Sequence, residues 1–138
     1  MNVSIIYNSK HGTTKAYAIE IGKFLTSKGI ENKVASVSDY DNEYLQKADI
    51  VLLGCWTSGL MLFAQHPDRV WKNFVMELAD IKGKKLGLFT TYLLATGTMF
   101  RKMEALLNGK ADTAQLILKS KNSSLTNKNI SQLEVFIS

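Results

Sequence analysis

The sequence predicts an α/β fold in which a five-stranded parallel sheet of order 2-1-3-4-5 lies between two layers of helices. Short apolar segments alternate with amphipathic ones along the chain. Two of the apolar segments are uninterrupted hydrophobic runs, as in strands covered on both faces. The 138 residues suit one such domain spanning residues 1–138. In such sheets the connections are right-handed and ligands lie at the carboxyl ends of the strands.

The five predicted strands are short, apolar and mostly β-branched: residues 3–7, 33–37, 49–54, 86–91 and 115–118. Residues 50–53 and 116–118 are the continuous runs, and we expect both faces of these strands to be covered. The segment 33–37 is more polar, so we place it at an edge of the sheet.

Helical spacing of apolar residues separates these strands, at about residues 17–28, 42–46, 67–78, 99–107 and 129–137. Pro67 suits the first position of the third helix, and Val70, Phe74 and Leu78 then form its apolar face. His66, directly before it, is expected to be a helix cap or a surface residue.

The net charge of +5 is unevenly distributed. Residues 1–81 carry 8 Lys/Arg and 9 Asp/Glu, whereas residues 82–128 carry 9 Lys/Arg and 2 Asp/Glu. There is no run of five like charges and no groove-reading motif, so we expect no nucleic-acid partner. A partner or substrate with negative charge fits the excess better.

Several kinds of site are disfavoured. The single cysteine excludes a disulfide framework, and neither metal-ligand spacing nor a Ser/His/Asp set is present. We therefore expect no metal and no catalytic side chain, and we expect Cys55 to be a small buried residue. No apolar run reaches the roughly 18 residues of a membrane span, and the N-terminus has no secretion signal, so a cytoplasmic monomer is expected.

Residues 8–14 connect the first strand to the first helix and carry the clearest sign of a ligand. Hydroxyl groups, a glycine and the free N–H groups of a helix N-terminus form a site that suits phosphate. The same residues can also form a plain turn, with Ser9 or Thr13 as the helix cap. Neither a dinucleotide-binding fingerprint nor a P-loop is present.

The segment Ser9-Lys10-His11-Gly12-Thr13-Thr14 resembles the phosphate loop of the flavodoxin family, whose pattern is Ser/Thr-x-x-Gly-x-Thr. The resemblance implies a flavodoxin-like three-layer sandwich of the short-chain type that binds FMN. It places Ser9, His11, Gly12, Thr13 and Thr14 around the phosphate, with Lys10 at the crest of the loop.

The segment after the third strand, Gly54-Cys55-Trp56-Thr57-Ser58-Gly59, is similar to the flavodoxin loop that begins Gly-Cys. This likeness implies that residues 56–59, which are Trp56, Thr57, Ser58 and Gly59, contact the flavin. Ser58 stands where many flavodoxins have an aromatic residue, and the apolar segment 60–63 replaces acidic residues. Trp56 either lies beside the flavin or packs over the third helix, and segment 60–63 forms a docking surface or a lid.

The loop after the fourth strand supplies the last predicted contacts. By the same resemblance Thr91, Tyr92 and Leu93 cover the other face of the flavin. Tyr92 can equally be an aromatic residue at the rim of the sheet.

These residues imply an FMN-binding electron-transfer protein that shuttles electrons between a reductase and an acceptor, partners with acidic docking surfaces. Because acidic residues are missing after Gly59 and Lys10 and Lys15 lie close, we expect a less negative potential for the fully reduced flavin than in acidic flavodoxins. Two alternatives stay open. One is a small FMN-dependent oxidoreductase acting on a quinone or porphyrinogen-like substrate, which the apolar segments 60–63 and 93–94 favour. The other is a flavin-free protein that binds a phosphate or a phosphorylated partner.

Overall fold

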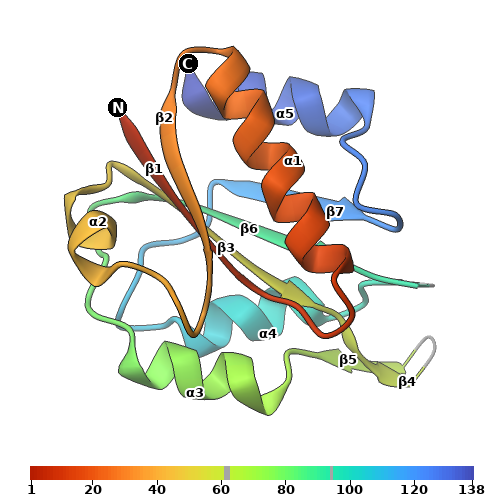
Figure 1. Ribbon diagram of the computed structural model, residues 1–138. Helices are drawn as coiled ribbons and strands as arrows, with labels where there is room; N and C mark the ends of the chain where they lie inside the picture. The colour runs from red at the N-terminus through yellow and green to blue at the C-terminus, as the bar shows by residue number, and fades with distance from the viewer. Residues whose placement is uncertain (61–62, 94) are drawn as a thin grey trace.

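The computed structural model describes residues 1–60, 63–93 and 95–138, and its centre is a five-stranded parallel sheet (Figure 1). The sheet consists of β1 (Asn2–Asn8), β2 (Glu31–Ser36), β3 (Ile50–Trp56), β6 (Lys85–Thr91) and β7 (Leu116–Ser120). Their order is β2-β1-β3-β6-β7, which is the predicted 2-1-3-4-5 when only these five strands are counted. The numbering differs because two short strands, β4 (Ser58–Leu60) and β5 (Phe63–His66), form a separate antiparallel pair where we had expected a loop.

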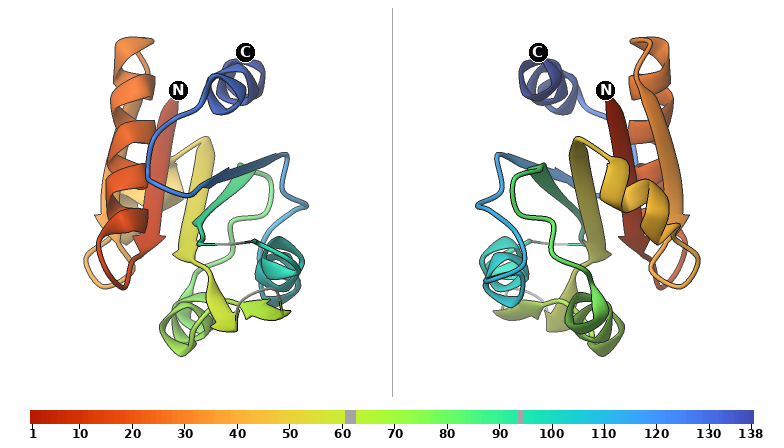
Figure 2. Two further views of the ribbon diagram at one scale, coloured as in Figure 1. Left: turned by 90° about the vertical axis from the view of Figure 1, so that its right-hand side faces the viewer. Right: turned by 90° about the vertical axis from the view of Figure 1, so that its left-hand side faces the viewer.

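Helices cover both faces of this sheet. They are α1 (Thr13–Ser27), α2 (Asn42–Lys47), α3 (Arg69–Glu77), α4 (Met99–Leu106) and α5 (Asn127–Ile137). Figure 2 shows α1 and α5 on one side of the sheet and α3 and α4 on the other. None of the helices in the described part of the chain is long and apolar enough to cross a membrane.

The continuous apolar run of β3 is explained by its central position. Val51, Leu53 and Cys55 point into the core beneath α3 and α4, whereas Ile50 and Leu52 belong to the core beneath α1 and α5. Both faces are therefore buried, as the sequence predicts.

Both edge strands lie where the predicted strand order places them. β2 lies at an edge, as its polar composition predicts. β7 is the opposite edge strand, as the predicted order 2-1-3-4-5 requires, and its apolar run predicted cover on both faces. Leu116 and Leu118 are buried there, while Ile117 is only partly covered.

The third helix differs from the prediction in its start and at one position of its buried face. It begins after Asp68 and not at Pro67, because the Asp68 carboxylate accepts a hydrogen bond from the Trp71 N–H at 2.9 Å and caps the helix. Phe74 and Leu78 are buried as predicted, whereas Val70 is 50% exposed and Trp71 is buried instead. His66, expected as a cap or surface residue, is the half-buried last residue of β5.

The β4–β5 hairpin is joined to the segment that precedes α4. The Thr98 hydroxyl donates a hydrogen bond of 3.2 Å to the Gln65 carbonyl. Gly97 adopts a φ of 52° beside the Gln65 side chain, where an added Cβ would overlap that side chain. Glycine is therefore required at this close approach. Residues 61–62 and 94 lie outside the described residues, so the expected lid or docking surface formed by segment 60–63 stays a prediction.

Candidate functional site

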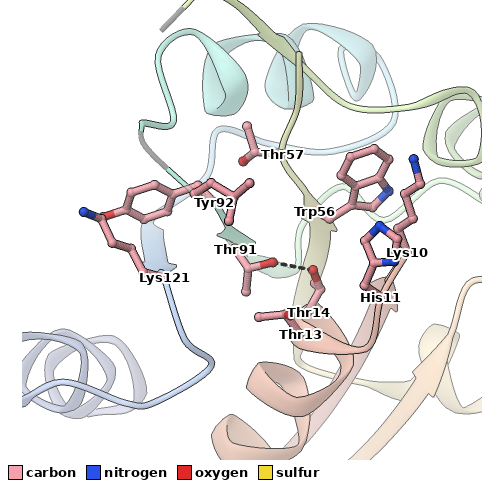
Figure 3. A pocket seen from close by; sticks show the side chains of 10 residues that line it. Lys10, His11, Thr13, Thr14, Trp56, Thr57, Thr91, Tyr92 and Lys121 are labelled. Atoms are coloured by element: carbon pink, nitrogen blue, oxygen red, sulfur yellow. Dashed lines mark hydrogen bonds between the residues drawn. The ribbon is translucent and has the colours of Figure 1, made fainter. Parts of the chain in front are cut away.

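A cavity of about 260 Å³ opens where β1, β3 and β6 end, and the three predicted loops meet there (Figure 3). The residues that line it are Lys10, His11, Thr13, Thr14, Trp56, Thr57, Thr91, Tyr92, Leu93 and Lys121. Nine of these ten were predicted from the sequence, and Lys121 was not. In the part of the chain that the structure describes, the lining contains hydroxyl, aromatic and basic side chains and no carboxylate.

The loop after β1 leads into α1 through a glycine in the left-handed region. Gly12 has a φ of 92°, which residues with a Cβ rarely adopt, and its N–H donates to the Ser9 hydroxyl at 3.1 Å. The first helical bond runs from the Ala16 N–H to the Gly12 carbonyl at 2.9 Å. The N–H groups at positions 13–15 precede that bond, and the Gly12 cap offers them no side-chain acceptor. Neither Ser9 nor Thr13 is the cap residue that the turn interpretation required.

The floor of the cavity is a pair of threonines from different elements. Thr14 of α1 and Thr91 of β6 are buried, and their hydroxyl oxygens lie 2.6 Å apart (Figure 3). The neighbouring Thr57 donates its N–H to the Thr91 carbonyl at 2.9 Å. These bonds hold the ends of β3 and β6 and the start of α1 in a fixed relation.

Trp56 forms one wall. The side chain is half-buried and packs against the core beneath α3 and α4, yet it also lines the cavity. Its indole N–H donates to Asp68 at 2.8 Å, and the Lys10 ammonium lies 4.8 Å from the centroid of the ring. The two interpretations of Trp56, a packing residue and a residue beside a ligand, therefore both describe it.

Asp68 supports this wall, and sequence reasoning missed it. Besides the indole of Trp56, its carboxylate accepts a hydrogen bond from the Asn8 amide at 2.7 Å and caps α3 through the Trp71 N–H at 2.9 Å. One side chain thus connects the ends of β1 and β3 with the start of α3. An Asp before a helix is a recognisable cap signal, but its contacts with Asn8 and Trp56 follow only from the fold.

Cys55, directly before Trp56, is buried, as predicted. Desolvation raises the pKa of its thiol from 9.0 to about 12. The Asn8 amide donates to its sulfur at 3.4 Å. A thiol that stays protonated and buried is a packing group and not a nucleophile.

The opposite wall is Tyr92, which Figure 3 shows across the cavity from Trp56. Its N–H donates to the Ser120 carbonyl at 3.2 Å, so it is held against the end of β7. The ammonium groups of Lys119 and Lys121 lie 5.8 Å and 5.7 Å from the centroid of its ring. The next residue, Leu93, is 88% exposed at the mouth of the cavity.

Four predicted residues do not line the cavity. Ser9 and Gly12 lie in the loop that forms its edge, where they shape the turn. Ser58 and Gly59 lie in β4, which follows the lining residue Thr57. The pairing of β4 with β5 is irregular between Ser58 and Leu60, and Gly59 lies at that irregularity. Within residues 1–60, 63–93 and 95–138, no group of three or more His, Cys, Asp or Glu side chains could hold a metal ion.

Comparison with known proteins gives consistent results. A family model described as a flavodoxin domain matches residues 4–132. Flavodoxin from Clostridium beijerinckii is 31% identical over 108 residues, which cover 78% of this chain and 76% of that protein. The solution structure of two-electron reduced Megasphaera elsdenii flavodoxin has a TM-score of 0.81 at 25% identity and covers 97% of both chains. A Fusobacterium nucleatum flavodoxin variant bound to flavin mononucleotide shares the fold, with a TM-score of 0.64 at 20% identity over 99% of this chain and 92% of that one.

Proposed function

Because the chain belongs to the flavodoxin family, we propose that it binds FMN in the cavity between Trp56 and Tyr92 and transfers electrons between redox proteins. The observation that carries this proposal is that a helix N-terminus and two aromatic walls border the same cavity. A cofactor with a phosphate at one end and a flat ring at the other matches this arrangement.

The groups present suit each part of FMN. The N–H groups at the start of α1, the Thr13 hydroxyl and the Lys10 ammonium are donors for a phosphate dianion, which the helix dipole also favours. Trp56 and Tyr92 offer apolar surface for a flat ring, and the peptides near Thr57 and Tyr92 are neighbours for its polar edge.

Bound FMN supplies a ring that takes up one or two electrons, and the chain sets how readily it does so. Among the described residues no carboxylate lines the cavity, whereas Lys10 and Lys121 do. Their positive charge favours negative charge on a ligand, so we expect a less negative potential for the fully reduced flavin than in acidic flavodoxins. Gly59 lets the Ser58–Gly59 peptide take either orientation toward the ring at little steric cost.

Titration of the apoprotein with FMN and with riboflavin, followed by quenching of flavin fluorescence, tests the proposal. Riboflavin lacks the phosphate, so we expect it to bind at least about tenfold more weakly than FMN, the loss of a few charge-assisted hydrogen bonds. Lys10→Ala should lower the affinity for FMN and leave the affinity for riboflavin unchanged. The matched variant Lys28→Ala, at the far end of α1, should change neither affinity. Equal affinity for FMN and riboflavin would contradict a phosphate site at α1. Failure to bind any flavin would favour the flavin-free alternative.

The oxidoreductase alternative draws on the exposed Leu93 at the cavity mouth, an apolar contact for a flat substrate. Steady turnover of NAD(P)H with a quinone, without a separate reductase, would favour it over the electron carrier. We also propose that the protein is a cytoplasmic monomer, which cell fractionation and size-exclusion chromatography test.

A further inference from the structure

Lysine side chains flank the mouth of the cavity, and we call Lys10, Lys119 and Lys121 the basic rim. Figure 3 shows Lys10 and Lys121 on opposite sides of the pocket. Lys10 lies against the ring of Trp56 at 4.8 Å, while Lys119 and Lys121 lie against the ring of Tyr92 at 5.8 Å and 5.7 Å. Two ammonium groups therefore converge on one aromatic ring beside the cofactor site.

The chain leaves this charge uncompensated. In the described part of the chain, none of the three rim lysines forms an ion pair. Exposed lysines elsewhere do so: Lys23 pairs with Glu20, Lys33 with Asp41 and Lys47 with Glu43. Most lysines outside the rim also form no ion pair within the described residues, so what distinguishes the three rim lysines is their position against the two aromatic walls of one cavity.

The excess is greatest on the Tyr92 side. Near Trp56 the carboxylate of Asp68 offsets part of the charge of Lys10, although it is already engaged by three hydrogen-bond donors. No carboxylate lies among the cavity residues next to Tyr92. The pair Lys119 and Lys121 consequently produces a local positive potential at one edge of the cavity.

An apolar side chain protrudes within this charged border. Leu93 follows Tyr92 and is 88% exposed. An apolar contact ringed by charged groups is the usual anatomy of a transient protein interface, in which the apolar part packs and the charges set the choice of partner. A small ligand inside the cavity would not require Lys119, which is exposed and does not line it.

We propose that the basic rim and Leu93 form the docking surface for an acidic redox protein, one whose own redox centre is bordered by Asp and Glu side chains. The proposal rests on the proposed function and specifies the chemistry of the partner. Docking there brings the partner's centre next to the cofactor. One electron then passes from reduced FMN to the acceptor, for example from flavin to a ferric haem iron that becomes ferrous, and no covalent bond forms or breaks. Basic redox proteins are repelled by the same charges.

The experiment compares two haem proteins of opposite charge, acidic cytochrome b5 and basic cytochrome c. Binding of the flavin-loaded protein and of the apoprotein to immobilised cytochrome b5 is measured by biolayer interferometry from 20 to 500 mM salt. Electron transfer from the dithionite-reduced protein to each cytochrome is measured by anaerobic stopped flow. The variants are Lys119→Glu, the double variant Lys119→Glu/Lys121→Glu, and the matched control Lys28→Glu/Lys82→Glu, which changes net charge equally at the opposite end of the strands.

We expect cytochrome b5 to bind the wild type at low salt and to lose affinity as salt rises, while the rate with cytochrome c rises with salt. The double variant should bind cytochrome b5 at least about tenfold more weakly at 20 mM salt, with the difference shrinking at 500 mM. Lys119→Glu should show about half of this effect on a logarithmic scale and the same FMN affinity as the wild type.

Equal losses of affinity for cytochrome b5 in the double variant and in the Lys28→Glu/Lys82→Glu control would overturn the proposal, because net charge alone would then explain binding. Faster reaction of the wild type with cytochrome c than with cytochrome b5 at low salt would also overturn it. The measurement with the apoprotein distinguishes a failure of docking from a failure of FMN binding. A protein that binds cytochrome b5 through the basic rim but binds no FMN would refute the proposed function and support the docking surface.

Discussion

Replacement of Asp68 tests whether one carboxylate holds the Trp56 wall of the site in place. The Asp68→Ala variant removes three hydrogen bonds at once, those from the Asn8 amide at 2.7 Å, the Trp56 indole at 2.8 Å and the Trp71 N–H at 2.9 Å. It leaves the buried Asn8 amide with only the weak sulfur acceptor of Cys55 at 3.4 Å.

The expected loss follows from these contacts. A lost helix cap costs about 1 kcal/mol, and each hydrogen bond to an ionised group contributes about 1.5–3 kcal/mol. The full sum is not reached, because water can replace the acceptor of the half-buried Trp56 indole and Cys55 remains for Asn8. We expect Asp68→Ala to lower the free energy of unfolding by about 2–4 kcal/mol. Asp68→Asn keeps an acceptor for the cap but not the charge, so it should lose about half as much.

Urea denaturation followed by far-UV circular dichroism measures these losses, and flavin fluorescence measures FMN affinity in the same variants. Asp80→Ala is the matched control, because Asp80 is an exposed carboxylate that accepts only the Lys82 N–H, at 2.9 Å. It should change stability by less than about 0.5–1 kcal/mol. If the free energy of unfolding of Asp68→Ala lay within about 1 kcal/mol of the wild-type value, the view that this carboxylate organises the Trp56 wall would be refuted.

Three further predictions concern the core. Cys55 should not react with Ellman's reagent in the native state at pH 8 but should react fully in urea. The pKa of its thiol rises from 9.0 to about 12 on folding. The contribution of this thiol to stability is therefore complete below pH 9 and is lost as the pH rises toward 12. Gly54→Ala should lower the free energy of unfolding in urea by about 2–3 kcal/mol, since the added Cβ overlaps the ring of Phe89; unchanged stability would mean that this ring has room to move. Tyr17→Phe removes the buried hydrogen bond to Asn129 at 2.8 Å and should cost about 1–2 kcal/mol, and a neutral result would show that Asn129 finds another donor.

The layout of the sheet could be predicted because its strands carry strong one-dimensional signals. The apolar run of β3 required cover on both faces, and the polar composition of β2 required an edge. The apolar run of β7 has a related physical reason. Leu116 and Leu118 face the core beneath α1 and α5, while Ile117 is partly covered by the core beneath α3 and α4. Three consecutive apolar residues therefore appear even at an edge.

Contacts that depend on the neighbours of a strand could not be predicted. Thr91 of β6 pairs with Ser120 of β7, and this register places Lys119 and Lys121 beside Tyr92. The sequence shows the lysines but not the register. The start of α3 was misplaced because the cap at Asp68 was not recognised, and of the predicted face Phe74 and Leu78 are buried while Trp71 is buried in place of Val70.

The contact between the β4–β5 hairpin and the start of α4 has a mechanical consequence. Strand β5 is hydrogen-bonded to Thr98 through the Gln65 carbonyl, and Gly97 fits closely against the same residue. The segment that follows β3 and the segment that follows β6 are therefore held against each other. Because the hydrogen bond and the close fit join the two segments directly, a displacement of either one near Gln65 requires the other to move or to lose these contacts.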